Sequence, residues 1–294
     1  MDSVTLKAYG KVNLSLDITG RRPDGYHLVR MIMQTVDIHD TVTVSRTAGT
    51  DITLTTDLPY LPTDSHNIAY KAADLMRQTY GITDGVNIRI DKCIPVAAGM
   101  AGGSTDAAAV LSAMNALFDL GCDVDTLKGY GLKLGADVPY CITGGTYLAE
   151  GIGEVLTALP PVPSCHVLVV KPKVSASTKE VYGAYDSVER TYHPDVDGMI
   201  QAIGSGSICD VAPLLGNVLE EVTAGLYPVI TDIKKTMLEG GALNAIMTGS
   251  GPTVFGLFED EDRLNRLVKQ FNNNPDIQAA YNTGFINTIE GSMP

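Results

Sequence analysis

The sequence predicts an α+β protein of two domains, and three observations support that prediction. The chain has 294 residues, which at about 150 residues per domain is enough for two. Stretches that alternate apolar and polar residues are interleaved with stretches whose apolar residues recur every three to four positions, the patterns of strands and helices. A proline-rich segment, 159–163, interrupts both patterns, so we expect one domain over 1–160 and a second over 161–294.

The first half is predicted to alternate strands with helices. Apolar and polar residues alternate strictly over 12–18, and similar strand patterns cover 41–46, 51–55 and 86–90. Helical periodicity predicts helices over 65–80, 104–118 and 124–134. The first of these helices is expected to end at Gly81 and the third at Gly135, since glycine readily adopts the backbone conformations that end a helix.

The second half is predicted to begin with an apolar strand over 166–171. Helical segments follow between 178 and 239. The remaining elements are expected to be strands over 243–247 and 254–258, a helix over 260–271 and a strand over 279–286. Strands and helices interleaved in this way predict a second α+β sandwich.

Charge and composition exclude several classes of function. The 34 acidic residues outnumber the 21 basic ones and give a net charge of −13, which argues against nucleic-acid or anionic-membrane binding. An anionic small substrate is not excluded, because it responds to local groups across a screened solvent. The five cysteines contain no C-x-x-C pair, and the N-terminus has no apolar signal segment, so we expect a reduced, cytoplasmic protein. Monomer and homodimer both stay open.

The most informative segment is a run of small residues between a predicted strand and a predicted helix: Pro95, Val96, Ala97, Ala98, Gly99, Met100, Ala101, Gly102, Gly103, Ser104, Thr105 and Asp106. Glycines let a backbone approach an anion closely, and a helix N-terminus offers free N–H groups and a partial positive charge. We therefore expect a phosphate site, with Ser104 and Thr105 as hydroxyl donors or magnesium ligands. The alternative is an ordinary tight loop with Ser104, Thr105 or Asp106 as the helix cap. The run matches neither a Walker A nor a G-x-G-x-x-G sequence.

This loop resembles the phosphate loop of the GHMP kinases, which include galactokinase, homoserine kinase and mevalonate kinase. Two further segments resemble the family's other motifs, Lys11-Val12-Asn13-Leu14 and Thr248-Gly249-Ser250-Gly251-Pro252-Thr253, in the family's order. The resemblance implies a two-domain GHMP kinase fold, with an N-terminal domain like domain 2 of ribosomal protein S5 and a C-terminal ferredoxin-like α/β sandwich. It also implies ATP and Mg²⁺ as cofactors.

The segments Gly20-Arg21-Arg22-Pro23-Asp24-Gly25-Tyr26-His27 and Gly135-Ala136-Asp137-Val138-Pro139-Tyr140-Cys141 resemble a branch of the family that phosphorylates a cytidine-bearing diphosphate. The resemblance implies that ATP is bound by Asn67 and by residues 95–105. Asn67 is equally well interpreted as a helix cap. One departure is Ala97-Ala98, where many relatives carry glycines, and alanine leaves the backbone less freedom.

Lys11 and Asp137 are the residues that the resemblance marks as catalytic. A carboxylate held after a helix can accept a hydroxyl proton, and a lysine can keep that carboxylate ionised or polarise the transferred phosphoryl group. Without the resemblance, Asp137 is equally well a loop aspartate that satisfies backbone donors, and Lys11 is a solvated edge lysine. Asn13 shares a strand face with Lys11 and is expected to position the substrate.

Tyr26, His27, Thr178 and Tyr182 are the residues that the resemblance assigns to the cytidine pocket. An aromatic face can stack on a pyrimidine, and a histidine can hydrogen-bond its polar edge. Thr178 and Tyr182 are four residues apart on a predicted helix and so share a face. The alternative for all four is ordinary packing.

Three further expectations complete the sequence-based picture. The loop 249–251 is predicted to close over the substrate, to support the phosphate loop, or simply to turn a hairpin. Cys141 is expected to be a buried, inert thiol. No metal-ligating residue is assigned, and another GHMP kinase, a decarboxylase of the same fold and a non-catalytic ligand sensor are the competing functions.

Overall fold

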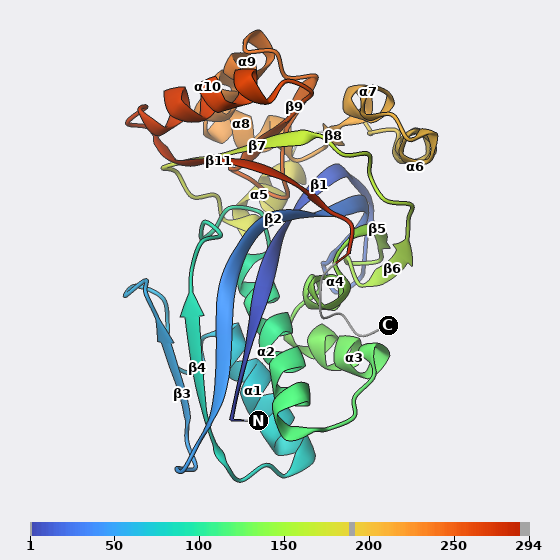
Figure 1. Ribbon diagram of the computed structural model, residues 1–294. Helices are drawn as coiled ribbons and strands as arrows, with labels where there is room; N and C mark the ends of the chain where they lie inside the picture. Colours follow the sequence, from blue (N-terminus) through green and yellow to red (C-terminus); the bar gives the residue numbers. More distant parts are fainter. Residues whose placement is uncertain (1, 188–191, 289–294) are drawn as a thin grey trace.

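Two long antiparallel strands, β1 (Ser3–Arg21) and β2 (His27–Thr47), form the centre of the fold in the computed structural model, which describes residues 2–187 and 192–288 (Figure 1). β2 also pairs with β4 (Gly85–Asp91) and with β5 (Thr146–Glu150). At the outer edge, β3 (Ile52–Thr56) runs parallel to β4, and β5 pairs with β6 (Val155–Ala158). The remaining strands of the first half are thus attached to β2, directly for β4 and β5 and through these two strands for β3 and β6.

Four helices of the first half pack beside this sheet (Figure 1). They are α1 (Ile68–Tyr80), α2 (Gly102–Phe118), α3 (Val124–Leu134) and α4 (Val138–Thr143). α2 buries the small side chains of Ala107, Ala108, Ala109 and Ala113, which let it approach the neighbouring elements closely. Its N-terminus therefore takes a defined position against β1.

In the second half, β7 (His166–Pro172) lies between β10 (Val254–Phe258) and β11 (Ile277–Ile286), and β9 (Asn244–Met247) extends the sheet beyond β10. The helices are α5 (Thr178–Tyr185), α6 (Val196–Ser205), α7 (Ile208–Val211), α8 (Glu220–Leu226), α9 (Val229–Glu239) and α10 (Glu261–Asn272). A 3₁₀ turn (Ala212–Leu214) and a two-residue strand, β8 (Gly216–Asn217), complete the set.

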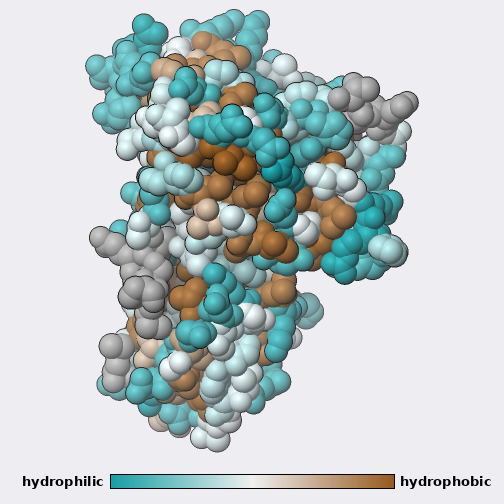
Figure 2. Space-filling view, turned by 90° about the vertical axis from the view of Figure 1, so that its right-hand side faces the viewer, coloured by the Kyte–Doolittle hydropathy of each residue, from teal (hydrophilic) through white to brown (hydrophobic). Residues whose placement is uncertain are grey.

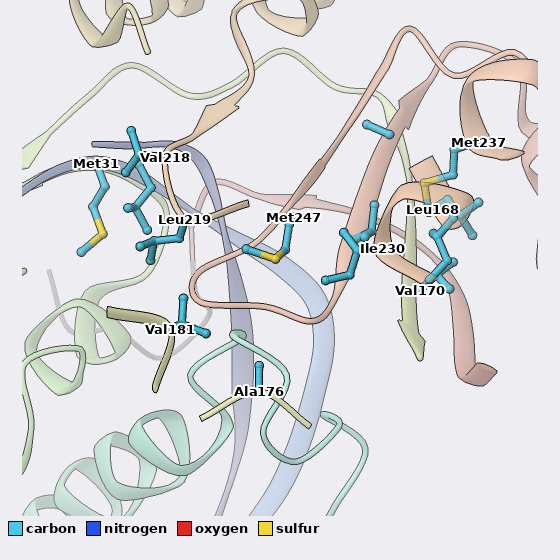
Figure 3. Close-up of a cluster of buried hydrophobic side chains, with 14 of the residues drawn as sticks. Met31, Leu168, Val170, Ala176, Val181, Val218, Leu219, Ile230, Met237 and Met247 are labelled. Atoms are coloured by element: carbon cyan, nitrogen blue, oxygen red, sulfur yellow. The ribbon is translucent and has the colours of Figure 1, made fainter. Parts of the chain in front are cut away.

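The two halves are joined by hydrogen-bonded strands and by a shared core. β11 returns to pair with β2 at Phe285 and Ile286, and β8 adds in parallel to β1. One hydrophobic cluster combines Met31 of the first half with Leu168 and Met247 of the second (Figure 3). The division at residue 160 stays a prediction, because the structure connects the halves through main-chain as well as side-chain contacts.

Most predicted elements are confirmed, with shifts at their ends that have local causes. α1 begins at Ile68 because the side chain of Asn67 caps it, accepting a hydrogen bond from the N–H of Ala69. α2 begins two residues before the predicted start because Ala101 adopts a left-handed conformation and turns the chain into the helix. The sequence-based prediction missed α4, β5, β6 and β8, which are short, and much of the length of β1 and β2.

Within the described ranges, no helix is long and apolar enough to cross a bilayer. On the face that carries α3 and β6, hydrophobic residues gather across the middle, between hydrophilic ends (Figure 2). The cytoplasmic location stays a prediction.

Candidate active site

A cavity of about 620 Å³ collects most of the sequence-predicted site residues. Its wall contains residues 95–104 of the glycine-rich loop, Lys11 from β1, Asp137 from the start of α4, and Thr178 and Tyr182 from α5. These residues come from both halves of the chain. The glycine-rich loop, the two predicted catalytic side chains and the helix assigned to the predicted nucleoside pocket therefore share one cavity.

The glycine-rich loop leads into the N-terminus of α2 without any side-chain cap. Ala101, the residue before the helix, has a φ of 59°, and Ala97 has a φ of 52°. The alternative of Ser104, Thr105 or Asp106 as the helix cap is therefore wrong. Thr105 instead donates its hydroxyl to the carbonyl of Tyr9 and is buried, so the structure does not bring that hydroxyl into the cavity. The uncapped N–H groups of α2 remain available for an anion.

The loop between β9 and β10 packs directly against the glycine-rich loop. A Cβ added to Gly99 would overlap the carbonyl oxygen of Thr248, and a Cβ on Gly249 would lie 2.9 Å from the carbonyl oxygen of Gly99. Thr248 also accepts a hydrogen bond from the N–H of Asn13 (3.0 Å). The loop 249–251 is thus both a hairpin connection and a support for the glycine-rich loop.

Gly99→Ala is expected to lower the free energy of unfolding by about 2 kcal/mol or more. A Cβ at residue 99 would overlap the backbone carbonyl of Thr248, which is not free to move aside. The φ of 72° at this residue is also unfavourable for any residue that has a Cβ. Gly103→Ala is the matched control, because its Cβ would lie 3.6 Å from Ile68 and alanine favours the helix. Denaturant unfolding measures both; equal stabilities for the two variants would contradict the close contact between the loops.

Lys11 and Asp137 both line the cavity, but only the side chain of Lys11 is fixed by a hydrogen bond within the described residues. Lys11 is 5% exposed and donates from Nζ to Oδ1 of Asn13 (2.7 Å). Asp137 occupies the cap position of α4 without using its carboxylate as a cap. Within residues 2–187 and 192–288, no ion pair joins Lys11 to Asp137, and the Asp137 carboxylate has no hydrogen-bond partner. That carboxylate is therefore free to accept a bond from a ligand.

Two predicted residues next to this pair lie outside the cavity wall. Asn13 is fully buried behind Lys11, which it orients. Cys141 follows Asp137 by one turn, and burial raises the pKa of its thiol to about 12, so it is the inert side chain that the sequence predicted.

On the other side of the cavity, α5 presents Thr178 and Tyr182. The hydroxyls of Thr178 and Ser250 lie 3.0 Å apart, and burial raises the pKa of Tyr182 to about 12. His27 packs on the ring of Tyr182, with centroids 4.8 Å apart, but is not itself in the cavity wall. Tyr26 is 61% exposed and also lies outside that wall. Of the four predicted nucleoside residues, the structure thus places Thr178 and Tyr182 in the cavity wall and His27 against Tyr182, and leaves Tyr26 apart.

Asn67 is interpreted from the sequence either as a helix cap or as an ATP-binding residue, and its position allows both. Its side-chain oxygen caps α1, and the residue also lines the cavity beside His66 and the phosphate loop. A capping role does not exclude contact with a ligand, so the adenine assignment stays a prediction.

Sequence reasoning missed a buried cluster of charges beneath the phosphate loop. Lys92 donates to Asp106 Oδ2 (2.7 Å) and to Asp40, and Asp40 Oδ1 accepts the N–H groups of Cys93 (2.6 Å) and Ile94 (2.8 Å). Burial raises the pKa of Asp106 to about 8. Burial lowers the pKa of Lys92, but the charges of Asp106 and Asp40 outweigh it and the net shift is upward.

Lys92 and Asp106 line the same cavity as the phosphate loop. Asp106 Oδ1 is buried and has no partner in the described part of the chain. No local pattern reveals this cluster, because its three members lie on separate elements: β2, the segment after β4, and α2.

Comparisons with known proteins agree with this geometry. The family model for the GHMP kinases N terminal domain matches residues 67–145, and the model for the GHMP kinases C terminal domain matches residues 199–277. A 4-diphosphocytidyl-2-C-methyl-D-erythritol kinase of Lachnoclostridium phytofermentans is 50% identical over 285 residues, 97% of this chain and 98% of that protein. The enzyme of the same name from Lachnospira eligens is 52% identical over 264 residues, 90% and 92% of the two chains.

Solved structures extend the comparison to the fold. A crystal structure of 4-(cytidine 5'-diphospho)-2C-methyl-D-erythritol kinase aligns with a TM-score of 0.81 and 31% identity, over 96% of this chain and 99% of that one. Homoserine kinase from Cytophaga hutchinsonii aligns with a TM-score of 0.78 and 20% identity, over 99% and 96% of the two chains, which supports the fold alone. The predicted GHMP kinase fold is confirmed. The chain belongs to the GHMP kinase family, as do its 4-diphosphocytidyl-2-C-methyl-D-erythritol kinase relatives.

Proposed function

We propose that this protein is an ATP-dependent kinase that phosphorylates the C2 hydroxyl of 4-diphosphocytidyl-2-C-methyl-D-erythritol, in the non-mevalonate route to isopentenyl diphosphate. The observation that carries the proposal is the single cavity that combines an uncapped glycine-rich loop, Lys11 and Asp137. The relatives that are about 50% identical over most of the chain bear the name of this activity.

ATP is the phosphoryl donor in this proposal, with its phosphates on residues 95–104. The N-terminus of α2 offers unsatisfied N–H groups and the positive end of the helix dipole. The ammonium of Lys11 lines the same cavity. These groups attract a polyphosphate although the protein carries a net charge of −13.

Mg²⁺ bound with a nucleotide takes most of its ligands from phosphates and water, so one or two protein oxygens suffice. Ser104 and Asp106 line the cavity beside the glycine-rich loop, and Asp106 Oδ1 is a buried oxygen without a partner among the described residues. These two residues fit the ion and would hold it. The ion would neutralise charge on the phosphates.

Asp137 and Lys11 act on the attacking hydroxyl in this proposal. The unpaired carboxylate of Asp137 accepts the hydroxyl proton as the oxygen attacks the γ-phosphorus. Lys11, held in place by Asn13, stabilises negative charge on the attacking oxygen and on the transferred phosphoryl group. Positioning supplies most of the remaining acceleration, since phosphoryl transfer needs little covalent help from the protein.

A coupled ADP-release assay tests the proposal directly. We expect turnover with the cytidine diphosphate methylerythritol substrate and background rates with mevalonate, homoserine and galactose. Turnover with one of the other alcohols instead would assign a different GHMP kinase activity. Binding of ATP and of the cytidine substrate without any ADP release would favour a non-catalytic sensor.

The uridine analogue of the substrate is expected to react with a kcat/KM at least tenfold below that of the cytidine form. His27 and Tyr182 build a polar and aromatic corner, and a site arranged to hydrogen-bond one base edge leaves buried groups unpaired against the other. The measurement is kcat/KM for both forms at saturating ATP. Equal values would remove His27 and Tyr182 from base recognition.

A further inference from the structure

We propose that Asp186 is a positioning residue that fastens the β1–β2 hairpin to α5 and so preforms the nucleoside side of the cavity. The proposal rests on the proposed function. We call the group of Asp186, Arg21 and His27 the Asp186 latch. It joins segments about 160 residues apart in sequence, the end of the first hairpin and the end of a helix in the second half.

One carboxylate holds both strands of the hairpin. Nε2 of His27 donates to Oδ1 of Asp186 (2.6 Å), and Nη1 of Arg21 lies 3.2 Å from Oδ2. Arg21 and His27 are direct cross-strand partners at the hairpin end. Because the two oxygens of Asp186 bind opposite strands, the latch constrains the hairpin end as a unit and not one side chain alone.

The position of Asp186 in its helix indicates a role in the folded protein. Asp186 caps the C-terminus of α5, where the helix dipole disfavours a negative charge, and the last turn of α5 carries no basic residue. Arg21 and His27 supply the compensating groups from another element. A local preference for helix formation therefore does not account for an aspartate here, whereas the contact with the hairpin does.

The rest of α5 is held mainly by packing, and Tyr182, Ala184 and Tyr185 lie against the hydrophobic core. Val181 is its one buried side chain, and it belongs to the core that Figure 3 shows. Near its N-terminus, Thr178 contacts Ser250, and the preceding segment is held by Tyr227, which donates to the carbonyl of Ser175 (3.0 Å). The latch is thus a polar tie at the C-terminal end of α5, and we expect its loss to loosen the part of the helix that carries Tyr182.

The latch also sets the ring of His27. With Nε2 committed to Asp186, the ring packs on Tyr182 and meets Tyr185 edge-on, with centroids 6.4 Å apart. Nδ1 is then the ring nitrogen left for a ligand. A fixed ring binds a base without first losing rotational freedom, which is why we expect the latch to act on affinity and base discrimination and not on phosphoryl transfer.

The test compares Asp186→Ala, Asp186→Asn and Asp186→Glu with the wild type. The first probe is calorimetric binding of cytidine 5′-diphosphate and uridine 5′-diphosphate, and the second is steady-state kinetics with both substrates. We expect Asp186→Ala to weaken cytidine 5′-diphosphate binding and raise the acceptor KM about tenfold, with kcat and the KM for ATP within about twofold. Asp186→Asn and Asp186→Glu, which keep an acceptor oxygen, should recover part of the affinity, and discrimination against uridine should fall in Asp186→Ala.

Asp197→Ala is the matched control for Asp186→Ala. Asp197 of α6 makes the same kind of contact with Arg30 of β2, at 2.6 and 3.0 Å, and neither residue lines the cavity. This variant should bind cytidine 5′-diphosphate as the wild type does. A general effect of breaking an ion pair between the halves would weaken binding in both variants, and that result would overturn the proposal.

The remaining outcomes separate the latch from the proposed function. Wild-type affinity and KM in Asp186→Ala would overturn the latch, as would an equal loss for ATP. A wild type that binds cytidine 5′-diphosphate but releases no ADP, with the binding loss still seen in Asp186→Ala, would overturn the kinase and support the latch. A wild type that binds no cytidine nucleotide would overturn both.

Discussion

Asp137→Asn is expected to lower kcat by two to four powers of ten while both ligands still bind. The substitution keeps the shape of the side chain but removes the charge and the basicity that would accept the hydroxyl proton, help that is typically worth about 10²- to 10⁴-fold. Within the described part of the chain, the carboxylate of Asp137 makes no hydrogen bond or ion pair that stabilises the fold, so the variant should fold normally. The measurement is single-turnover phosphoryl transfer together with calorimetric binding of both ligands.

Lys11→Ala is expected to cause a loss of similar size, and the double variant should be damaged far less than the product of the two losses. Groups that act on one hydroxyl as a unit lose their effect together. Lys7→Ala is the matched control, because Lys7 is an exposed lysine on the same strand, four residues upstream. A fully active Asp137→Asn enzyme would contradict the role of Asp137 as general base. A double variant whose loss in kcat equals the product of the two single losses would show that Lys11 and Asp137 act independently.

Lys92→Met is expected to lower the free energy of unfolding by about 3 to 5 kcal/mol. Its ammonium is the buried partner of Asp40 and Asp106, and removing one partner of a buried ion pair leaves the groups it paired with uncompensated. Adding Asp106→Asn should restore part of the loss, because an amide at that position needs no proton uptake on folding. Lys71→Met, at an exposed position of α1, is the control and should change stability by less than about 0.5 kcal/mol.

The deficit of Lys92→Met is expected to change little between pH 5 and 7 and to grow as the pH rises through about 8. Burial raises the pKa of Asp106 to about 8, far above its unfolded value of about 4, so below pH 7 the folded wild type and the folded variant both hold the extra proton and lose stability in parallel as the pH rises. Lys92 opposes the rise of this pKa, so the folded variant keeps the proton above pH 8, where the wild type releases it, and only the variant continues to lose stability. Urea unfolding at pH 6, 7, 8 and 9 measures the trend, and a deficit that stays constant up to pH 9 would contradict it.

The sequence by itself determined the elements whose signals are local. Strict alternation over 12–18 predicted part of β1, and helical periodicity with a following glycine predicted the ends of α1 and α3. The glycine-rich loop before an alanine-rich helix predicts a phosphate site, because close backbone approach and a free helix N-terminus are properties of a short segment. Lys11, Asp137, Thr178 and Tyr182 were named through motifs that are themselves short.

Only the tertiary structure decided which distant residues meet. It brought Lys92, Asp40 and Asp106 together beneath the phosphate loop, placed Thr248 against Gly99, and joined Asp186 to the first hairpin. It also turned the hydroxyl of Thr105 away to Tyr9 and left Tyr26 outside the cavity. Burial and pairing of charges depend on how sheets and helices pack, and the residues involved lie too far apart in sequence for any periodic pattern to link them.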